Sequence, residues 1–236
     1  MEYQFFKVII ATQEHFDFAP LICTEMEASA KARGTGIAKR SPEYLQQKMA
    51  EGKAVIAFSP EGEWAGFCYI ETWSHEQYVA NSGLIVSPNF RKGGVARQIK
   101  QRIFELSRSK YPDAKIFGLT TGLAVMKINS ELGYEPVTYS ELTSDDAFWA
   151  GCQSCVNYDI LLNKERKNCL CTAMLYDPAE QKPMAVQAPE PQGAEKWQGF
   201  LSEKWQKMRE RALRLFRAEP AAETQESFSP STYKTA

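Results

Sequence analysis

Two adjacent glycines, Gly93 and Gly94, stand between a short apolar run and a segment with helical spacing, and basic residues flank them. Because glycine has no side chain, successive backbone N–H groups in such a turn can converge on a phosphate. The N-terminus of the following helix adds partial positive charge. Arg91, Lys92 and Arg97 would supply full charges for a pyrophosphate or a ribose phosphate. The spacing matches neither the G-x-G-x-x-G fingerprint nor the P-loop. The alternative is an ordinary helix start with exposed basic side chains.

Four of the six cysteines lie within 20 residues of one another, as Cys152-x2-Cys155 and Cys169-x-Cys171. A C-x2-C turn can point two thiolates at one centre, and two cysteines that alternate along a strand face the same side. The second pair departs from the usual spacing. The pattern therefore leaves three alternatives open: a structural Zn²⁺ site, a disulfide or redox pair, and buried free thiols.

The hydrophobic pattern predicts the elements that would position these groups. Apolar runs bounded by turn residues predict strands, and apolar positions three and four residues apart predict helices. Ser41 followed by Pro42 and Glu43 is typical of a helix start. We expect strands at 5–11, 54–59, 64–72, 82–87, 115–121 and 134–138, and helices at 12–31, from 41 onward, at 91–108 and at 125–132. This order predicts an α/β protein with a mixed sheet and helices on both faces.

Composition and charge exclude several classes of protein. The 236 residues are 44% hydrophobic, 12% aromatic and 24% charged, which is typical of a globular core and excludes a wholly disordered or collagen-like chain. A net charge of −1 gives no global reason to bind nucleic acid. No apolar run is long enough to predict a transmembrane span. The N-terminal residues lack the order of a signal peptide, so we expect a cytoplasmic protein with reduced thiols.

The composition changes after residue 177. Residues 1–177 carry 19 basic and 21 acidic side chains and form the expected domain. Residues 178–193 contain four prolines and few branched apolar residues, which predicts a linker. Residues 194–217 combine an apolar stripe with seven basic and three acidic residues, which predicts an amphipathic basic helix. It would dock on its own domain, on a second subunit in a homo-oligomer, or on a membrane surface or partner. Residues 218–236 are predicted to be a disordered tail.

The phosphate-binding turn and a later segment resemble two motifs of the GNAT acyltransferase superfamily. Arg91-x-x-Gly94-x-Ala96, after Leu84-x-Val86-x-Pro88, is similar to its acyl-CoA signature R/Q-x-x-G-x-G/A. The segment 126–134 resembles its next motif, a short helix that closes with Gly-Phe or Gly-Tyr. The resemblance covers residues 5–175. It implies a GNAT-like α/β fold with a mixed, mostly antiparallel sheet, splayed central strands and helices on both faces.

Within that superfamily the sequence is most similar to the acyltransferase domain of N-acetylglutamate synthases. The similarity rests on short stretches at 36–41, 87–91, 119–121 and 132–137, and on 157–168, which resembles the closing Asn-Tyr and Arg-x-Ser elements. It implies an N-acyltransferase for the α-amine of an amino acid, with glutamate favoured and a role in arginine biosynthesis. Many such synthases carry an amino-acid-kinase-like domain ahead of this one. We do not expect one here, because the first predicted strand starts at Phe5.

The resemblance implies where acetyl-CoA or another acyl-CoA would bind as co-substrate. Its pantetheine arm would lie between two splayed strands, 83–87 and 116–121. The backbone of Leu84, Ile85 and Val86 would pair with the arm, and one N–H there would polarise the thioester carbonyl. The phosphates would contact the turn formed by Arg91, Lys92, Gly93, Gly94, Val95, Ala96 and Arg97.

The same resemblance implies candidate catalytic residues. An amine attacks a thioester only when neutral, so a base should help, and Glu71 on the preceding strand is the candidate. The alternative for Glu71 is a solvent-facing strand residue. Many relatives carry a tyrosine as the acid that protonates the thiolate. Asn129 stands at the matching position and cannot donate a proton in that way, so it would only hydrogen-bond the thiol or the pantetheine.

Glutamate would require basic residues for its two carboxylates. Lys39, Arg40 and Arg166 stand where the family places basic residues, and exposed loop charges are the alternative at each position. Two other functions stay open: a GNAT enzyme for another small amine or a protein N-terminus, and an acyl-CoA-binding sensor without turnover.

Overall fold

The computed structural model describes residues 5–34, 39–181, 207 and 208. The chain divides into two compact units, residues 1–186 and 187–236. Every strand and helix discussed below belongs to the first unit. Apart from residues 178–181, Lys207 and Met208, the predicted linker at 178–193, helix at 194–217 and tail at 218–236 lie outside the described residues.

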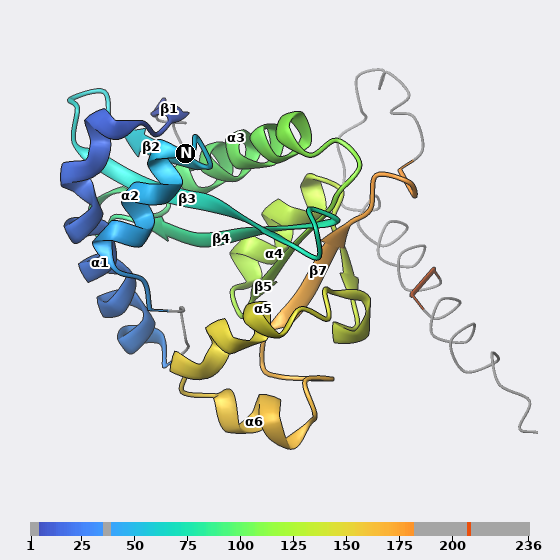
Figure 1. Cartoon of the computed structure of the whole chain (residues 1–236). Helices are drawn as coiled ribbons and strands as arrows, with labels where there is room; N and C mark the ends of the chain where they lie inside the picture. Colours follow the sequence, from blue (N-terminus) through green and yellow to red (C-terminus); the bar gives the residue numbers. More distant parts are fainter. Residues whose placement is uncertain (1–4, 35–38, 182–206, 209–236) are drawn as a thin grey trace, which may run out of the picture. The chain divides into compact units, whose positions relative to one another are not determined.

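The first unit is built on a seven-stranded sheet with the order β1-β2-β3-β4-β5-β7-β6 (Figure 1). All neighbouring strands are antiparallel except β4 and β5, which are parallel. This arrangement confirms the predicted mixed, mostly antiparallel sheet. The strands are β1 (Lys7–Ile10), β2 (Ala54–Phe58), β3 (Trp64–Trp73), β4 (Tyr78–Val86), β5 (Lys115–Thr120), β6 (Glu135–Val137) and β7 (Thr172–Tyr176).

Helices cover both faces of the sheet (Figure 1). One face packs against α3 (Val95–Lys110) and α4 (Leu123–Glu131). The other packs against α1 (Ala19–Arg33) and α2 (Pro42–Ala50), and further along against α5 (Asp146–Ala150) and α6 (Tyr158–Asn163). Successive strand residues alternate between these faces, as Val79 and Ala80 do on β4. Among the described residues no helix has the length and apolarity to span a bilayer.

Strands β4 and β5 pair over only three residues of each strand. The parallel register runs from Tyr78 opposite Lys115 to Ala80 opposite Phe117, and β4 then continues to Val86 without pairing to β5. The register between β3 and β4 also shifts in this part of β4, where Tyr69 lies opposite Ser82 and Phe67 opposite Ile85. Two strands that stop pairing leave backbone donors and acceptors free along the open edge. The predicted splay of the central strands is therefore present.

Gly83 occupies the shifted part of β4 with a φ of +64°. A Cβ at this position would lie 2.3 Å from Cε1 of Tyr69, whose ring is fully buried. Both the backbone conformation and the close approach of the ring therefore favour glycine. The register shift between β3 and β4 is therefore built around this residue.

Most elements up to β6 match the sequence-based prediction, and α5, α6 and β7 were missed. The N-cap predicted at Ser41 is confirmed, because its hydroxyl accepts a hydrogen bond from the Tyr44 N–H at 3.2 Å. Strand β4 begins at Tyr78 rather than residue 82. No element was predicted for α5, α6 or β7, which are short and carry little periodic signal. Strand β7 nevertheless lies in the interior of the sheet, between β5 and β6.

We expect Gly83→Ala to destabilise the protein more than Gly34→Ala does. Gly34 has nearly the same φ, +60°, but an added Cβ there would have no atom within 4 Å, so its substitution costs only the backbone strain of about 1 kcal/mol. Gly83→Ala adds the clash with Tyr69, and overpacking costs about 1–3 kcal/mol more. Urea unfolding of both variants measures the difference. Equal losses of unfolding free energy would contradict the packing role of Gly83.

Candidate active site

A cavity of 360 Å³ lies at the split between β4 and β5. Its walls include Gly83 and Leu84 from β4 and Gly118 and Leu119 from β5. The cavity also receives side chains from both layers of helices and from the loops after β5 and α5. The charged or amide side chains among its lining residues are Arg33, Arg40, Glu71, Asn81, Lys100, Asn129 and Asn157. The split therefore joins the two faces of the sheet at one polar site.

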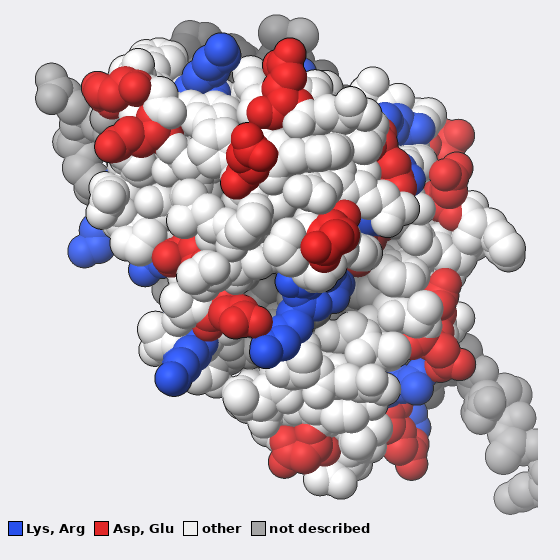
Figure 2. Space-filling view, turned by 60° about the vertical axis from the view of Figure 1, so that its left-hand side comes forward, with Lys and Arg blue, Asp and Glu red and all other residues white. Residues whose placement is uncertain are grey.

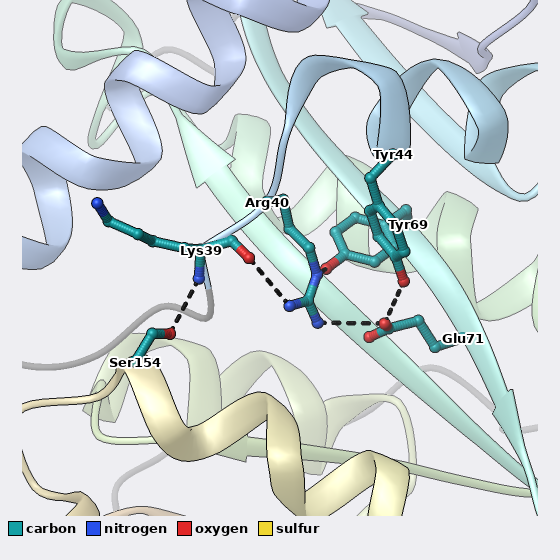
Figure 3. Close-up of polar contacts among 6 residues, drawn as sticks. All are labelled: Lys39, Arg40, Tyr44, Tyr69, Glu71 and Ser154. Atoms are coloured by element: carbon teal, nitrogen blue, oxygen red, sulfur yellow. Dashed lines mark hydrogen bonds and ion pairs between the residues drawn. The ribbon is translucent and has the colours of Figure 1, made fainter.

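Glu71 lies at this cavity near the end of β3, at the centre of a four-residue cluster (Figure 3). Its carboxylate oxygen Oε1 accepts hydrogen bonds from the Tyr44 hydroxyl and from Arg40 Nη2, the latter at 3.2 Å. Arg40 Nε in turn donates to the Tyr69 hydroxyl at 2.9 Å. We call these four residues the Glu71 cluster. Oε2 of Glu71 has no hydrogen-bond partner among the residues that the structure describes.

Burial and charge fix the protonation states within the Glu71 cluster. Burial raises the pKa of Tyr44, and the neighbouring Glu71 carboxylate raises it further. The same two causes raise the pKa of Tyr69 well above its usual value. For Arg40, burial opposes the charged form, but Tyr69 and Glu71 together raise its pKa. The two phenols are therefore neutral and the guanidinium is charged at neutral pH. Glu71 is only 5% exposed, and its burial is offset by these hydrogen bonds and by the ion pair with Arg40.

Of the three basic residues predicted to contact a carboxylate substrate, Arg40 lines the cavity. Lys39 is exposed and pairs with Glu27 at 3.2 Å, while its backbone N–H donates to Ser154 (Figure 3). Arg166 is an exposed residue paired with Asp146. Neither Lys39 nor Arg166 belongs to the lining residues. The structure thus brings only Arg40 together with Glu71.

Arg33 also lines the cavity, and sequence analysis missed it. It is the last residue of α1, where a basic side chain is common because its positive charge interacts favourably with the negative end of the helix dipole. Burial, and after it the nearby Arg91, lowers the pKa of the Arg33 guanidinium. A guanidinium in such surroundings favours an anionic ligand. On the face shown in Figure 2, basic and acidic side chains are interspersed.

The predicted phosphate-binding turn connects β4 to α3. Lys92 and Gly94 have positive φ values of 70° and 87°, and α3 begins at Val95. Within the described part of the chain, no group accepts a hydrogen bond from the backbone N–H of Lys92, Gly94, Val95 or Ala96. These donors are free to bind an anion at the start of a 16-residue helix. The turn is not part of the cavity wall, but the open edge of β4 leads from one to the other.

Two of the three basic side chains of the turn already have partners. Arg91 donates to Glu25 and Ser29, each at 2.8 Å, and its Nε donates to the Val86 carbonyl at 3.3 Å. Arg97 pairs with Glu131 on α4. These contacts tie the turn to both helix layers. A phosphate at the turn would therefore depend on backbone N–H groups more than on guanidinium groups.

Asn129 on α4 is 1% exposed and lines the cavity. Its Nδ2 lies 3.7 Å from the Met174 sulfur, and its Oδ1 has no partner among the described residues. A buried carbonyl oxygen without a hydrogen bond is costly, so a ligand donor in the cavity would stabilise it. Asn129 is thus positioned to accept a hydrogen bond from a ligand, although it cannot act as an acid.

The four clustered cysteines line the cavity as free thiols. No group of three His, Cys, Asp or Glu side chains in the described residues could hold a metal ion, so the predicted structural zinc at Cys152, Cys155, Cys169 and Cys171 is not supported. Burial first, and then the neighbouring thiols, raise the pKa of Cys152 to about 11 and that of Cys171 to about 12. Thiols this weakly acidic are poor nucleophiles at neutral pH.

The sequence matches no protein-family model and no curated protein. The structure is similar to N-acetylglutamate synthase from Neisseria gonorrhoeae complexed with coenzyme A and N-acetyl-glutamate: the TM-score is 0.53, the identity is 17%, and the match covers 75% of this chain and 36% of that one. It is also similar to Rv2747 from Mycobacterium tuberculosis in complex with CoA and NLQ, with a TM-score of 0.52, 17% identity and coverage of 72% and 98%.

A third similar structure is yncA from Salmonella typhimurium with its cofactor acetyl-CoA, with a TM-score of 0.50, 12% identity and coverage of 78% and 99%. The chain spans about a third of the length of the Neisseria gonorrhoeae structures that it matches. At these identities the comparisons show the fold. The chain has the GNAT-like fold that its sequence motifs indicated.

We expect Tyr44→Phe to lower the free energy of unfolding at pH 7 by about 1–3 kcal/mol, because Glu71 loses a donor in a buried site.

The variant should also lose less stability than the wild type above pH 10. The pKa of Tyr44 is higher in the folded chain than its usual 10.0, so the unfolded chain ionises first and stability falls as the pH rises.

Tyr158→Phe is the matched control, because Tyr158 also lines the cavity but its hydroxyl makes no hydrogen bond to a described residue. Urea titrations at pH 7, 9 and 11 measure both effects. If Tyr44→Phe and Tyr158→Phe are equally stable at pH 7, Tyr44 does not support the Glu71 carboxylate.

Proposed function

We propose that this chain is an acyl-CoA-dependent N-acyltransferase that acylates the α-amine of a free amino acid, with glutamate as the first candidate. The observation that carries the proposal is the cavity at the β4–β5 split, where a free strand edge, a carboxylate and a guanidinium meet. The GNAT fold supports it, since similar structures hold CoA or acetyl-CoA. An enzyme with this activity would supply arginine biosynthesis from the cytoplasm.

The acyl donor would bind along β4. The free N–H groups at the start of α3 would hold the phosphates, together with Arg91, Lys92 and Arg97. The open edge at Leu84, Ile85 and Val86 would pair with the pantetheine amides, as a strand pairs with its neighbour. The carbonyl of Val86 already accepts a hydrogen bond from Arg91, so it is oriented but partly occupied. A backbone N–H of this edge would stabilise the oxyanion that develops on the thioester carbonyl.

The acceptor side has the charge pattern of a zwitterion. In the Glu71 cluster a carboxylate lies 3.2 Å from a guanidinium, and an α-amino acid carries an ammonium and a carboxylate one carbon apart. Glu71 Oε2 would accept a proton from the ammonium, directly or through water, and Arg40 would bind the α-carboxylate. Neutralising the ammonium frees its lone pair for attack on the thioester. This match favours a free amino acid over a simple amine.

A second carboxylate, as in glutamate, would need another cation. Arg33 lines the same cavity and carries no carboxylate partner among the ion pairs of the described residues, so it is well placed for this role. Lys39 and Arg166 stay candidates, but each would have to leave its present partner, Glu27 or Asp146. Asn129 Oδ1 would accept a hydrogen bond from the thiol or from a pantetheine amide.

Thiol release from acetyl-CoA, measured with a panel of amino acids and simple amines, tests the proposed function. We expect turnover with glutamate or another free amino acid, and at least about tenfold weaker kcat/KM for the matching amine without an α-carboxylate, since a lost charge-assisted hydrogen bond costs about 1.5–3 kcal/mol. Turnover that favours simple amines would contradict the role given to Arg40. Binding of CoA without turnover of any amine would leave an acyl-CoA sensor.

Replacing Glu71 by Gln tests the base. The amide still accepts hydrogen bonds from Tyr44 and Arg40, so the fold should be retained, while kcat should fall by about 10²-fold or more. Glu63→Gln, in the turn between β2 and β3, is the control and should keep wild-type activity. An unchanged kcat for Glu71→Gln would remove Glu71 from the proton transfer.

A further inference from the structure

Lys100 is a buried lysine whose side chain lines the active-site cavity from the α3 face. It is 2% exposed, and its helix neighbours Ile99 and Ile103 are fully buried. Its Nζ donates one hydrogen bond, to Asn81 Oδ1 at 3.3 Å. Within the described chain no carboxylate pairs with Lys100. An ammonium has three donors, so two are left for a ligand.

The groups around Lys100 are uncharged and hold it in place. Tyr134, which follows α4, lies with its ring 5.2 Å from Nζ and donates its hydroxyl to Asn81 Oδ1 at 2.9 Å. Asn81 Nδ2 donates to Ser107 on α3 at 2.9 Å, and Cys68 on β3 donates to the Ser82 carbonyl at 3.3 Å. Burial raises the pKa of Cys68 to about 11 and that of Tyr134 well above its usual value. Lys100 therefore has no anionic neighbour from α3, β3, β4 or the α4 side among the described residues.

The position of Lys100 relative to the split is set by Asn81. Asn81 directly follows Ala80, the last residue of β4 that pairs with β5. Its side chain points to the same face as Val79, toward α3, while Glu71 lies on the face of Tyr69. Lys100 and Glu71 thus reach the cavity from opposite faces of the sheet. In the proposed binding mode the thioester lies where β4 and β5 begin to separate, between Lys100 and Glu71.

The proposed reaction needs an acid for the leaving thiolate, and α4 does not supply one. The leaving CoA thiolate must gain a proton, and Asn129 cannot donate one in the required way. We propose that Lys100 is the catalytic acid that protonates the departing CoA thiolate, an inference that rests on the proposed acyl-CoA-dependent function. In this step the amine nitrogen bonds to the acyl carbon and the C–S bond breaks with its electron pair on sulfur. The substrate enters as an ammonium, so its nitrogen loses two protons: the first passes through Glu71 to solvent before the attack, and the second passes to Glu71 as the amide forms. The Lys100 ammonium gives a proton to the sulfur.

The surroundings of Lys100 suit this role. Burial lowers the pKa of Lys100, which makes its ammonium a stronger acid than a lysine in water. After the transfer the neutral amine lies in a site that does not favour charge, so the product state is also stabilised. Exchange with solvent returns a proton to Lys100 and removes one from Glu71, which restores both groups for the next turnover.

The ionisation of bound CoA tests the placement of Lys100 without requiring turnover. A cation within about 4–6 Å lowers the pKa of a neighbouring acid by about 1–3 units. We expect the thiol of CoA, followed by thiolate absorbance during a pH titration, to ionise at lower pH when bound to the wild type than when bound to Lys100→Met. Lys110→Met is the control on the same helix, because Lys110 lies outside the cavity, near the Glu51 carbonyl. Equal thiol pKa values in wild type and Lys100→Met would overturn the inference.

Kinetics then separate proton donation from charge alone. Lys100→Met should lower kcat by about 10²-fold with little change in KM for acyl-CoA, and the fall of kcat at high pH should disappear. The melting temperature should not fall, because an apolar side chain replaces an unpaired buried charge. Lys100→Arg should keep the lowered thiol pKa but not restore kcat, since a guanidinium is too weak an acid.

The failure of this inference is distinguishable from failure of the proposed function. A wild type that turns over, together with a Lys100→Met variant within about threefold of its kcat, overturns the acid role alone. An effect confined to KM overturns it as well, because Lys100 would then only bind the donor. If the wild type turns over no amine, the proposed function fails, and the thiol titration still decides whether Lys100 adjoins the sulfur.

Discussion

The structure depends on one constraint: strand β4 cannot stay paired with β5 beyond Ala80. Parallel pairing there is only three residues long, and the register between β3 and β4 shifts next to it, at Gly83. A sheet normally separates its two faces with a continuous layer of backbone. Here the layer opens, and the backbone groups that would bond to a neighbouring strand become available to a ligand. The cavity at the split follows from this opening.

The opening also explains why the charged groups of the site lie where they do. Glu71 and Lys100 are both buried, and buried charges of opposite sign in contact would pair and quench each other's reactivity. The sheet keeps them on opposite faces, so each has its own partners. Glu71 is held by Tyr44 and Arg40, and Lys100 by Asn81. In the binding mode proposed above, a thioester in the split would lie between Glu71 and Lys100 without either residue neutralising the other.

Sequence reasoning could predict the parts of the fold that have local signals. The cap at Ser41 and the strands β2 and β3 are each encoded within a few residues. Helix α3 was also predicted, but from residue 91, whereas it begins at Val95 after the two glycines. Strand β7 was missed because its interior position depends on pairing with β5 and β6, which a short apolar run does not reveal. Cys152 and Cys155 have the C-x2-C spacing of metal ligands, but the fold places them along a cavity wall, and no group in the described residues could hold a metal ion. Residue spacing in the sequence therefore predicts the local backbone better than it predicts which side chains meet in the folded protein.

The buried position of Lys100 could not be predicted from the sequence either. A lysine within an amphipathic pattern is normally interpreted as part of the solvated face, and only the packing of α3 against β4 shows that this one is inside. An unpaired buried ammonium destabilises the fold by roughly several kcal/mol even after relaxation of the surroundings, so packing alone would favour an apolar residue. Asn81 and Tyr134 offset part of this cost with a single acceptor and a ring face. These contacts leave two N–H donors of Lys100 unused beside the cavity, where a bound ligand could accept hydrogen bonds from them.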